Sequence, residues 1–305
     1  MVESAAWVLG IDLGGTGCRF VALTPSGEVL ARTIVATPVE PDIDVRGFLR
    51  RQVERLDRLS SPTAVGIGAS GPIDTAGIIR NSDTLAAFTG IPLLAMVQSE
   101  FGAPCVIDND AVAAAVAEAR SGAAIGADSL LHVTLGTGVG VCLLQGGEPF
   151  RGGDGAHPES GHFSVSGPPA PCYCGREICW EQRASRTALQ AAAANAGFAA
   201  NGDLRDIRIA ADAARAGDTA ALRVFTDYGA AVGEGLATLL ALYRPTTVVI
   251  GGGSATFLAE YRDAMMSVVE RTSLWHSTFT VRPTELDDFG GAIGGAYLAL
   301  ATLAR

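Results

Sequence analysis

The sequence predicts an α/β protein built of two packed lobes. A chain of 305 residues is long for a single hydrophobic core and suits two. Apolar runs typical of strands alternate with segments of helical spacing, which favours an α/β fold. Strands followed by a glycine-rich turn occur near residue 12 and again near residue 136, which indicates that both lobes follow one plan.

The N-terminal elements follow from short-range patterns. Residues 7–13, 20–23 and 29–35 are apolar runs joined by tight turns, and they predict an antiparallel meander. Apolar positions at helical spacing predict a helix from residue 45 to 56. Its other face carries Arg46, Arg50, Arg51, Arg55 and Arg58. This face is either a nucleic-acid patch or a solvated helix surface, and the acidic chain favours the solvated surface.

Further strands and helices can be placed along the rest of the chain. Buried strands are expected at 64–67 and 106–107, with an alanine-rich helix at 111–120. Strands are expected at 130–135, 141–144 and 247–250, helices within 185–243, and a C-terminal helix that begins at Gly290–Gly295. We therefore expect a small α/β lobe of residues 1–112 with the helix 292–305, and a large lobe of residues 113–291.

Charge and composition exclude several classes of protein. The net charge of −10 repels nucleic acid, and also repels free nucleotide unless backbone amides and a cation compensate. No basic leader and no apolar stretch of membrane-spanning length is visible, so a cytoplasmic protein without a membrane or nucleic-acid partner is expected. In that compartment the six cysteines are buried thiols or metal ligands.

Three glycine-rich turns each follow a predicted strand. They contain Asp12-Leu13-Gly14-Gly15-Thr16, Gly136-Thr137-Gly138 and Gly251-Gly252-Gly253. Glycine lets the backbone approach phosphate oxygens, Thr16 can donate a hydrogen bond, and Asp12 can hold hydrated Mg²⁺ through water. One such turn alone is as readily a hairpin, but three at strand ends favour phosphate binding.

Asp108-Asn109-Asp110 directly precedes the alanine-rich helix. The plain interpretation is an N-cap, for which Asp is a preferred residue. The functional interpretation is a general base, because a carboxylate that accepts a hydroxyl proton is what phosphoryl transfer to an alcohol requires. Both can hold, since one Asp can cap while another reacts.

His162, Cys172, Cys174 and Cys179 fall within eighteen positions. Three thiolates and one imidazole form a closed tetrahedral zinc set, which is typical of a structural site. The alternative is three buried cysteines beside an unrelated histidine. The Cys-x-Cys-Gly turn favours zinc, because it brings two sulfurs to one side of a loop. A zinc-bound His162 would also hold Glu159 rigidly, as a substrate-binding carboxylate requires.

These motifs resemble the ROK family of sugar kinases, which includes many bacterial glucokinases. The resemblance extends from Gly10 to Leu300. Its most specific parts are Glu159-Ser160-Gly161-His162, Cys172-Tyr173-Cys174-Gly175 and Cys179-Trp180-Glu181, which are similar to the family's Glu-x-Gly-His and cysteine signatures.

The resemblance implies a two-lobed actin/hexokinase-like (ribonuclease H-like) ATPase fold with the sugar in the interlobe cleft. It implies Asp110 as the catalytic base, phosphates on the turns at 14–16 and 136–138, adenosine beside 251–253, and cofactors ATP, Mg²⁺ and structural Zn²⁺. Substrate-binding residues are then Gly71, Asn109, Glu159, His162 and Glu181, with His157 as an added sugar contact. Family members are commonly homodimers or homotetramers.

The sequence departs from the family pattern at several positions. Gly17 stands where the family often has Lys, His157-Pro158 where it has Ala-Gly, Ile178 where it has Gly, and Ser185-Arg186 where it has Ser-Gly. The segment 81–90 also differs from the usual sugar-contacting loop. These changes concern the acceptor and the donor, so an N-acetylated hexosamine, mannose, fructose or a cyclitol stays open beside glucose.

Two rivals belong to other classes of protein. ROK repressors share this body but carry a DNA-binding helix-turn-helix before it, for which the first strand at about Trp7 leaves no room. A sugar-binding protein without catalysis is the second rival. The presence of Asp110 and of the phosphate turns argues against it.

Overall fold

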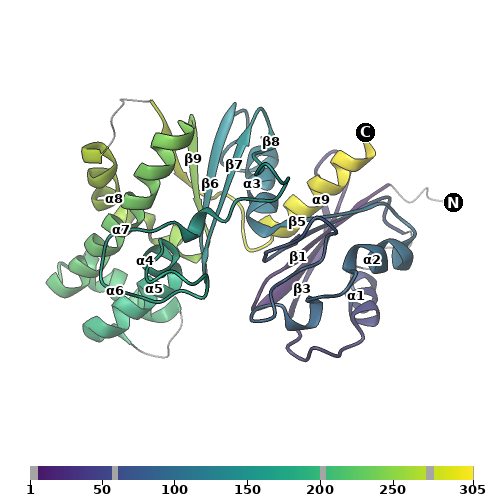
Figure 1. Ribbon diagram of the computed structural model, residues 1–305, viewed down its shortest axis with the longest axis horizontal. Coiled ribbons are helices and arrows are strands. Elements are labelled where there is room, and N and C mark those ends of the chain that lie inside the picture. The colour runs from purple at the N-terminus through teal and green to yellow at the C-terminus, as the bar shows by residue number, and fades with distance from the viewer. Residues whose placement is uncertain (1–5, 57–60, 200–203, 273–277, 305) are drawn as a thin grey trace. The chain divides into compact units, whose positions relative to one another are not determined.

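The computed structural model describes residues 6–56, 61–199, 204–272 and 278–304. The chain divides into two compact units. Unit 1 comprises Met1–Asp128, Leu144–Pro158 and Glu285–Arg305, and unit 2 comprises Ser129–Leu143 and Glu159–Thr284. The ribbon in Figure 1 is coloured along the chain and shows how unit 1 gathers both the beginning and the end of the sequence.

The elements of unit 1 are β1 (Val8–Leu13), β2 (Gly17–Leu23), β3 (Val29–Ala36), α1 (Val45–Glu54), β4 (Val65–Ala69), η1 (Ala86–Phe88), α2 (Leu93–Phe101), β5 (Cys105–Asn109), α3 (Asp110–Ser121), β8 (Glu148–Pro149) and α9 (Gly290–Leu303). The first sheet has the order β3-β2-β1-β4-β5. β1, β2 and β3 pair antiparallel, as the meander predicts, while β4 and β5 run parallel to β1.

Side chains of β1 alternate between two cores on opposite faces of this sheet. Leu9, Ile11 and Leu13 pack with residues of α1 and α2, whereas Val8 packs with α9 and α3. Figure 1 shows α1 and α2 on one side of the sheet and the yellow α9 on the other. The odd residues of β1 thus build a core, and Asp12, an even residue, faces α9.

The bounds of unit 1 differ from the expected 1–112 with 292–305. α3 belongs to unit 1 because it packs along α9. A Cβ on Gly294 would lie 1.8 Å from the carbonyl oxygen of Ala113, so only glycine allows this close helix contact. The helix that contains Asp110 is therefore fixed to the C-terminal helix.

The elements of unit 2 are β6 (Ser129–Leu135), β7 (Val139–Gln145), η2 (Ser160–His162), α4 (Glu181–Ala184), α5 (Arg186–Ala193), a π-helical turn η3 (Ala194–Phe198), α6 (Leu204–Arg215), α7 (Thr219–Tyr243), β9 (Thr247–Gly251), η4 (Gly253–Phe257), α8 (Leu258–Thr272) and β10 (Thr280–Pro283). The second sheet has the order β10-β9-β6-β7-β8, and its edge from Leu144 onward is grouped with unit 1.

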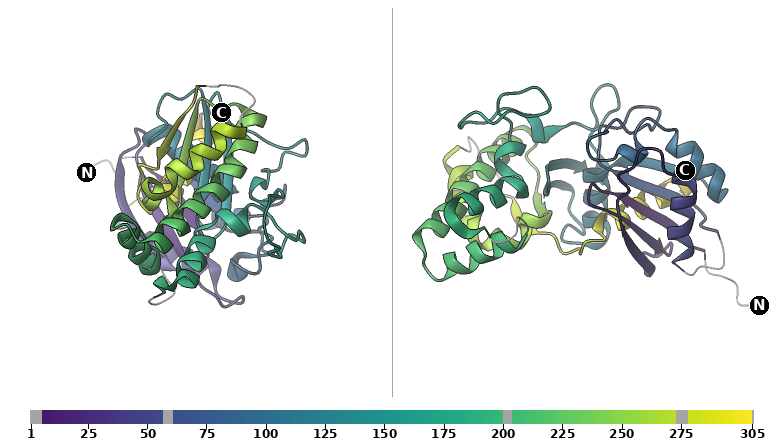
Figure 2. Two further views of the ribbon diagram at one scale, coloured as in Figure 1. Left: turned by 90° about the vertical axis from the view of Figure 1, so that its left-hand side faces the viewer. Right: turned by 90° about the horizontal axis from the view of Figure 1, so that it is seen from below.

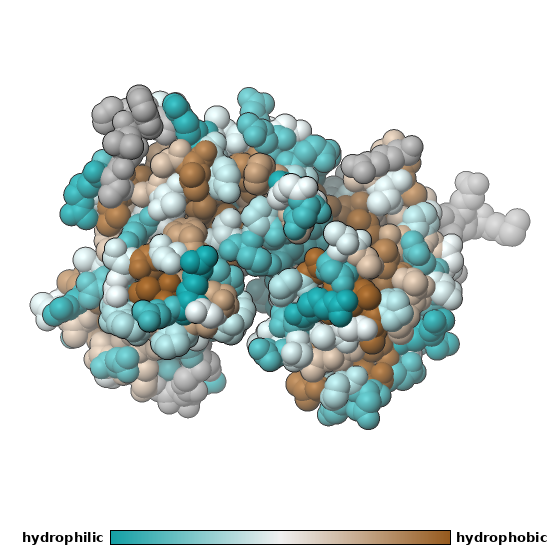
Figure 3. All heavy atoms as spheres, viewed as in Figure 1, coloured by the Kyte–Doolittle hydropathy of each residue, from teal (hydrophilic) through white to brown (hydrophobic). Residues whose placement is uncertain are grey.

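One large core joins the second sheet to its helices. Leu131, Val133, Val248 and Ile250 of β6 and β9 pack with buried residues of α5 to α8. Figure 2 shows α4 to α8 gathered on one side of this sheet. Within the described residues, no helix combines the length and the apolar character needed to cross a bilayer. The face drawn in Figure 3 mixes hydrophilic and hydrophobic residues over each unit.

Candidate active site

Three parallel strands of unit 1 end at the same edge of the first sheet. Leu13 of β1 pairs with Ala69 of β4, and Ala69 pairs with Asn109 of β5. The segments that follow these strands are the Gly14–Thr16 turn, the Ser70-Gly71 turn and the start of α3. Ligands of open α/β sheets bind beyond such carboxyl ends. The sheet therefore gathers the predicted residues of unit 1 at one edge.

Asp110 is the first residue of α3 and accepts two hydrogen bonds. Ser70 Oγ donates to Oδ2 at 2.7 Å, and the Ala111 N–H donates to Oδ1 at 2.8 Å. Burial raises the pKa of Asp110 above its ordinary value, while these hydrogen bonds lower it part of the way back. A carboxylate so held can accept a proton from an alcohol.

Asn109, and neither neighbouring Asp, is the N-cap of α3. Its Oδ1 accepts a hydrogen bond of 2.8 Å from the Ala111 N–H, and the residue is 8% exposed. The expected cap by an Asp is thus wrong: Asn109 holds the N-cap position, and its Oδ1 shares the Ala111 N–H with Asp110 Oδ1. The cap uses the amide oxygen, so the NH₂ group of Asn109 is the end that can donate to a ligand.

Asp12 lies on the face of β1 that α9 covers. A Cβ on Gly291, in the first turn of α9, would lie 2.9 Å from the Asp12 carboxyl carbon. Burial and the charge of Asp110 raise the pKa of Asp12 to about 7, against a lowering by Arg19. Arg19 Nη1 is 3.4 Å from Asp12 Oδ2 and donates to the Gly17 carbonyl at 3.2 Å. Arg19 was not among the predicted site residues, although Gly17 and Arg19 are two positions apart on β2 and so share one face of the strand.

The Gly14–Thr16 turn is tight and open to solvent. The Gly14 N–H donates to the Gly17 carbonyl at 3.2 Å, and the Thr37 hydroxyl donates to the Gly14 carbonyl. Gly15 and Thr16 are exposed, so their N–H groups and the threonine hydroxyl can be reached by a ligand.

Gly71 lies in the turn that follows β4, and His157 lies on another loop of unit 1. The Asn81 side chain donates to the Gly71 carbonyl at 3.0 Å, so the divergent segment 81–90 supports the Gly71 turn. His157 is half-buried at the end of a loop that begins at Arg151. Arg151 makes a two-pronged ion pair with Asp108, with Nη1 2.9 Å from Oδ1. This pair attaches the His157 loop to the residue that precedes Asn109.

The two glycine-rich turns of unit 2 are neighbours. β6 and β9 are parallel, and Thr134 pairs with Gly251, so their following turns lie at one sheet edge. The Gly136 N–H donates to the Gly138 carbonyl at 3.0 Å. Gly252 has φ +77°, and a Cβ there would lie 2.5 Å from the carbonyl carbon of Leu135. Only glycine lets the 251–253 turn approach the end of β6 so closely.

The zinc ligands predicted from the sequence converge in unit 2. The donor atoms of His162, Cys172, Cys174 and Cys179 all lie within 4.8 Å of one another. His162 Nδ1 is 3.5 Å from the Cys172 sulfur and 3.6 Å from that of Cys179. Zinc bonds of about 2.0 Å to nitrogen and 2.3 Å to sulfur at a tetrahedral angle separate such atoms by about 3.6 Å. The residues therefore fit zinc.

Local structure explains why the cysteine loop turns back on itself. The Gly175 N–H donates to the Cys172 carbonyl at 3.0 Å, with Gly175 at φ +87°. His162 Nε2 lies 2.9 Å from the Tyr173 hydroxyl, so the imidazole presents Nδ1 to the sulfurs and is held from its other side. Tyr173 was not among the predicted residues.

Glu159 and Glu181 lie beside this cluster. Burial of the Tyr173 hydroxyl raises its pKa, and the negative charges of Glu181 and Glu159 raise this pKa further. Glu181 is 8% exposed, and its Oε2 accepts a hydrogen bond of 3.1 Å from the Val139 N–H. A Cβ on Gly138 would lie 2.3 Å from the same oxygen. Glu181 therefore connects the His/Cys cluster to the 136–138 turn.

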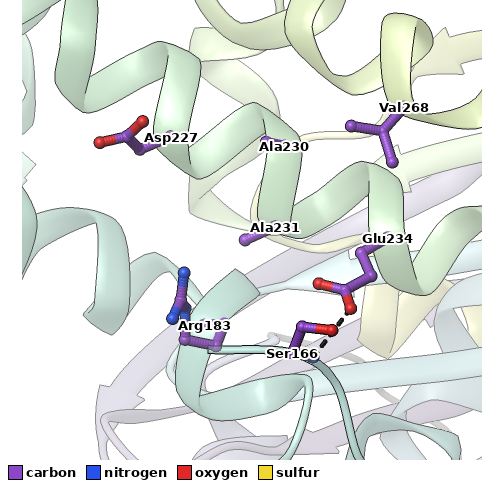
Figure 4. A pocket seen from close by; sticks show the side chains of 7 residues that line it. All are labelled: Ser166, Arg183, Asp227, Ala230, Ala231, Glu234 and Val268. Atoms are coloured by element: carbon purple, nitrogen blue, oxygen red, sulfur yellow. Dashed lines mark hydrogen bonds between the residues drawn. The ribbon is translucent and has the colours of Figure 1, made fainter. Parts of the chain in front are cut away.

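A surface hollow of about 490 Å³ lies elsewhere in unit 2 and contains none of the predicted site residues. Figure 4 shows Arg183 of α4, Asp227 and Glu234 of α7 and Val268 of α8 around it. Glu234 accepts a hydrogen bond of 2.8 Å from the Ser166 N–H. The hollow lies on the α7 side of α4, and Arg183 points into it (Figure 4).

Comparisons with known proteins agree with these motifs. The ROK family profile matches residues 8–302. A glucokinase of Streptomyces coelicolor is 30% identical over 312 residues, covering 95% of this chain and 96% of the relative. A crystal structure of a ROK hexokinase from Thermus thermophilus superposes with a TM-score of 0.83 at 31% identity, covering 98% of this chain and 99% of that chain.

A second solved structure is a ROK family glucokinase from Streptomyces griseus in complex with glucose and AMPPNP. It superposes with a TM-score of 0.81 at 30% identity, covering 96% of this chain and 99% of that chain. These matches confirm the predicted fold class. Because the family profile and both structures cover nearly the whole sequence, the chain belongs to the ROK family.

Proposed function

We propose that this ATP-dependent sugar kinase of the ROK family phosphorylates a hydroxyl of a hexose, with Asp110 as its general base. The observation that carries the proposal is the position of Asp110. It lies at the carboxyl edge of the first sheet, is half-buried, and keeps hydrogen bonds from Ser70 and Ala111. The glucokinases similar to this chain support a hexose as the acceptor.

The reaction follows from the chemistry of these groups. Asp110 accepts the proton of the attacking sugar hydroxyl while the oxygen of that hydroxyl forms a bond to the γ-phosphorus. The bond from that phosphorus to the β-γ bridging oxygen breaks, and ADP leaves. N–H groups of the turns at 14–16 and 136–138 donate to phosphate oxygens, and the 251–253 turn borders the adenosine. Asp12 would hold Mg²⁺ through water, and the ion would further neutralise the phosphate charge.

Each unit carries polar groups that can bind sugar hydroxyls. The NH₂ group of Asn109 can donate to a hydroxyl, while Glu159 and the free oxygen of Glu181 can accept. With Nδ1 on the metal, His162 offers only Nε2, which Tyr173 contacts in this structure. We propose that Gly71 and His157 complete the acceptor site.

We also propose a structural zinc ion on His162, Cys172, Cys174 and Cys179. Its donor set is closed, so it would leave no ligand position for substrate or water. Its role would be to fix the loop from Glu159 to Glu181, and so the carboxylates at both ends of it. An N-acetylated hexosamine, mannose, fructose or a cyclitol are the alternative acceptors, because His157 and the 81–90 segment depart from the family pattern.

An ADP-release assay tests the function. The protein is supplied with Mg²⁺, ATP and a panel of hexoses, amino sugars and cyclitols. Turnover on one acceptor names the substrate. Asp110→Asn should lower kcat by roughly a hundred- to ten-thousand-fold, about 3–5 kcal/mol, because no base then accepts the proton. Asp42→Asn, an exposed position before α1, is the matched control and should keep full activity. A near-normal rate in Asp110→Asn would exclude Asp110 as the base.

A further inference from the structure

Arg186 begins α5 at the side of the 136–138 turn. Its N–H donates to the Gly136 carbonyl at 2.8 Å. The next residue, Thr187, donates from its hydroxyl to the Thr137 carbonyl at 2.9 Å. Ser185 caps the helix by accepting from the Ala188 N–H at 3.1 Å. The first turn of α5 is thereby fixed to the Gly136 and Thr137 carbonyls of the turn, and Arg186 has a defined place beside it.

The guanidinium of Arg186 extends over the same turn with few good partners. Nη2 lies 3.5 Å from the Thr137 hydroxyl, and Nη1 lies 3.3 Å from the Gln190 side-chain oxygen. Charge-assisted hydrogen bonds of arginine are usually about 2.7–2.9 Å long, so both contacts are weak. No ion pair found among the described residues includes Arg186, although Arg19 and Arg151 each have a carboxylate. Its charge is free for a ligand.

We infer that Arg186 binds the phosphate chain of the donor at the 136–138 turn, an inference that rests on the proposed function of this turn. The Thr137 hydroxyl, which the guanidinium reaches, is itself one of the proposed phosphate ligands. A planar guanidinium can donate two parallel hydrogen bonds to phosphate oxygens. The protein carries a net charge of −10, so a local cation offsets the repulsion of an anionic donor. The ligand class is a polyphosphate chain, either of a nucleotide or inorganic.

Arg183 provides a matched control three residues earlier in the sequence. It carries the same charge, but it lines the separate hollow on the α7 side with Asp227 and Glu234 (Figure 4). A loss of charge at position 183 changes the net charge of the protein as much as a loss at 186. Any general electrostatic effect must therefore appear in both variants, whereas a contact with phosphate appears only at 186.

The test measures binding by calorimetry, without turnover. Wild type, Arg186→Lys, Arg186→Gln, Arg186→Glu and Arg183→Gln are titrated with MgADP, magnesium tripolyphosphate and adenosine. Arg186→Gln should weaken MgADP binding roughly tenfold, with a smaller loss for Lys and a larger one for Glu. Adenosine binding should stay unchanged, because adenosine has no phosphate. Arg183→Gln should bind all three like wild type. Equal melting temperatures of the variants show that the fold is kept.

The outcomes separate the inference from the function on which it rests. If wild type binds MgADP and Arg186→Gln binds it equally well, Arg186 has no role and only the inference is wrong. An equal loss of ADP and adenosine would also overturn it, because the effect would then be on the base or the fold. If wild type binds neither MgADP nor tripolyphosphate, the proposed kinase function itself fails. Tripolyphosphate bound with the same dependence on Arg186 would show that the phosphate chain alone is recognised.

Discussion

At the scale of single residues, the environment of Asp110 sets the pH at which it can act. Burial raises the pKa of Asp110, and the hydrogen bond from Ser70 lowers it. The pKa of the neighbouring Asp12 is itself raised to about 7. A base must be ionised, so activity should fall as the pH drops through the raised pKa. We expect the acid limb of kcat to lie above about 4, the ordinary range of aspartate.

Ser70→Ala tests this account of Asp110. The substitution removes a donor that favours the ionised carboxylate, so the pKa of Asp110 should rise and the acid limb should move to higher pH. The measurement is kcat against pH for wild type and variant. Ser121→Ala, at the other end of α3, serves as control and should leave the profile in place. A limb that moves to lower pH in Ser70→Ala would contradict the assignment.

At the scale of elements, the stability of the loop from Glu159 to Glu181 should depend on the proposed zinc ion. Cys179→Ser removes one of the four proposed zinc ligands and should abolish stoichiometric zinc in elemental analysis. The melting temperature should fall by roughly 5–15 °C, because a structural zinc site contributes folding free energy. Cys142→Ala, at a buried cysteine of β7 outside the cluster, should keep its zinc. Full zinc content in Cys179→Ser would show that the four residues are not the ligands.

Close packing of α9 on the first sheet depends on glycines that bind no ligand. A Cβ on Gly66 of β4 would lie 1.8 Å from the Gly295 carbonyl oxygen. Gly66→Ala should therefore lower the free energy of unfolding by about 3 kcal/mol, because helix and strand would have to separate. Urea unfolding measures the loss. Gly153→Ala is the control, since a Cβ there meets nothing within 4 Å. Equal stability of the two variants would show that α9 can shift at no cost.

Short-range patterns explain which elements could be predicted from the sequence. The meander, the helix at α3 and the three glycine turns depend on neighbouring residues, and the four residues of the His/Cys cluster lie close together in the chain. The roles of Arg19, Arg151 and Arg186 depend on partners brought near by folding, so sequence spacing could not show them. The same holds for α8, which packs on α7 through glycines: a Cβ on Gly229 would lie 2.4 Å from the Tyr261 carbonyl oxygen.

The glycines of this chain occur in turns and also in packed helices and strands. Clustered glycines predicted approach to phosphate, and the turns at 14–16, 136–138 and 251–253 fit that hypothesis. Gly10 and Gly66 serve a different purpose, because they bring strand backbones close to α9, and Gly294 brings α9 close to α3. A glycine needed for packing and one needed for a ligand look alike in sequence, and only the tertiary neighbours distinguish them.

At the scale of the whole molecule, charge argues against a nucleic-acid partner. The net charge is −10, and the basic face of α1 is partly neutralised within unit 1. The carboxylate of Glu100 on α2 lies 3.8 Å from Arg46 Nη1 and 3.2 Å from Arg50 Nε. Arg55 Nη1 donates a hydrogen bond to the side-chain oxygen of Gln52. Arg58 lies outside the described residues. The structure thus favours the solvated helix face over a nucleic-acid patch.

Duplex DNA should accordingly stay unbound by this chain. Counter-ion release needs several cations aligned along the phosphates, and here the α1 cations share a carboxylate within an acidic surface. In a gel-shift titration at about 150 mM salt we expect no retarded duplex, and lowering the salt should not produce one. Binding that strengthens as salt falls, and that is lost in an Arg46→Gln/Arg50→Gln variant, would make α1 a nucleic-acid surface and revive the repressor hypothesis. Binding unaffected by that double variant would locate the DNA contact elsewhere and equally contradict the charge argument.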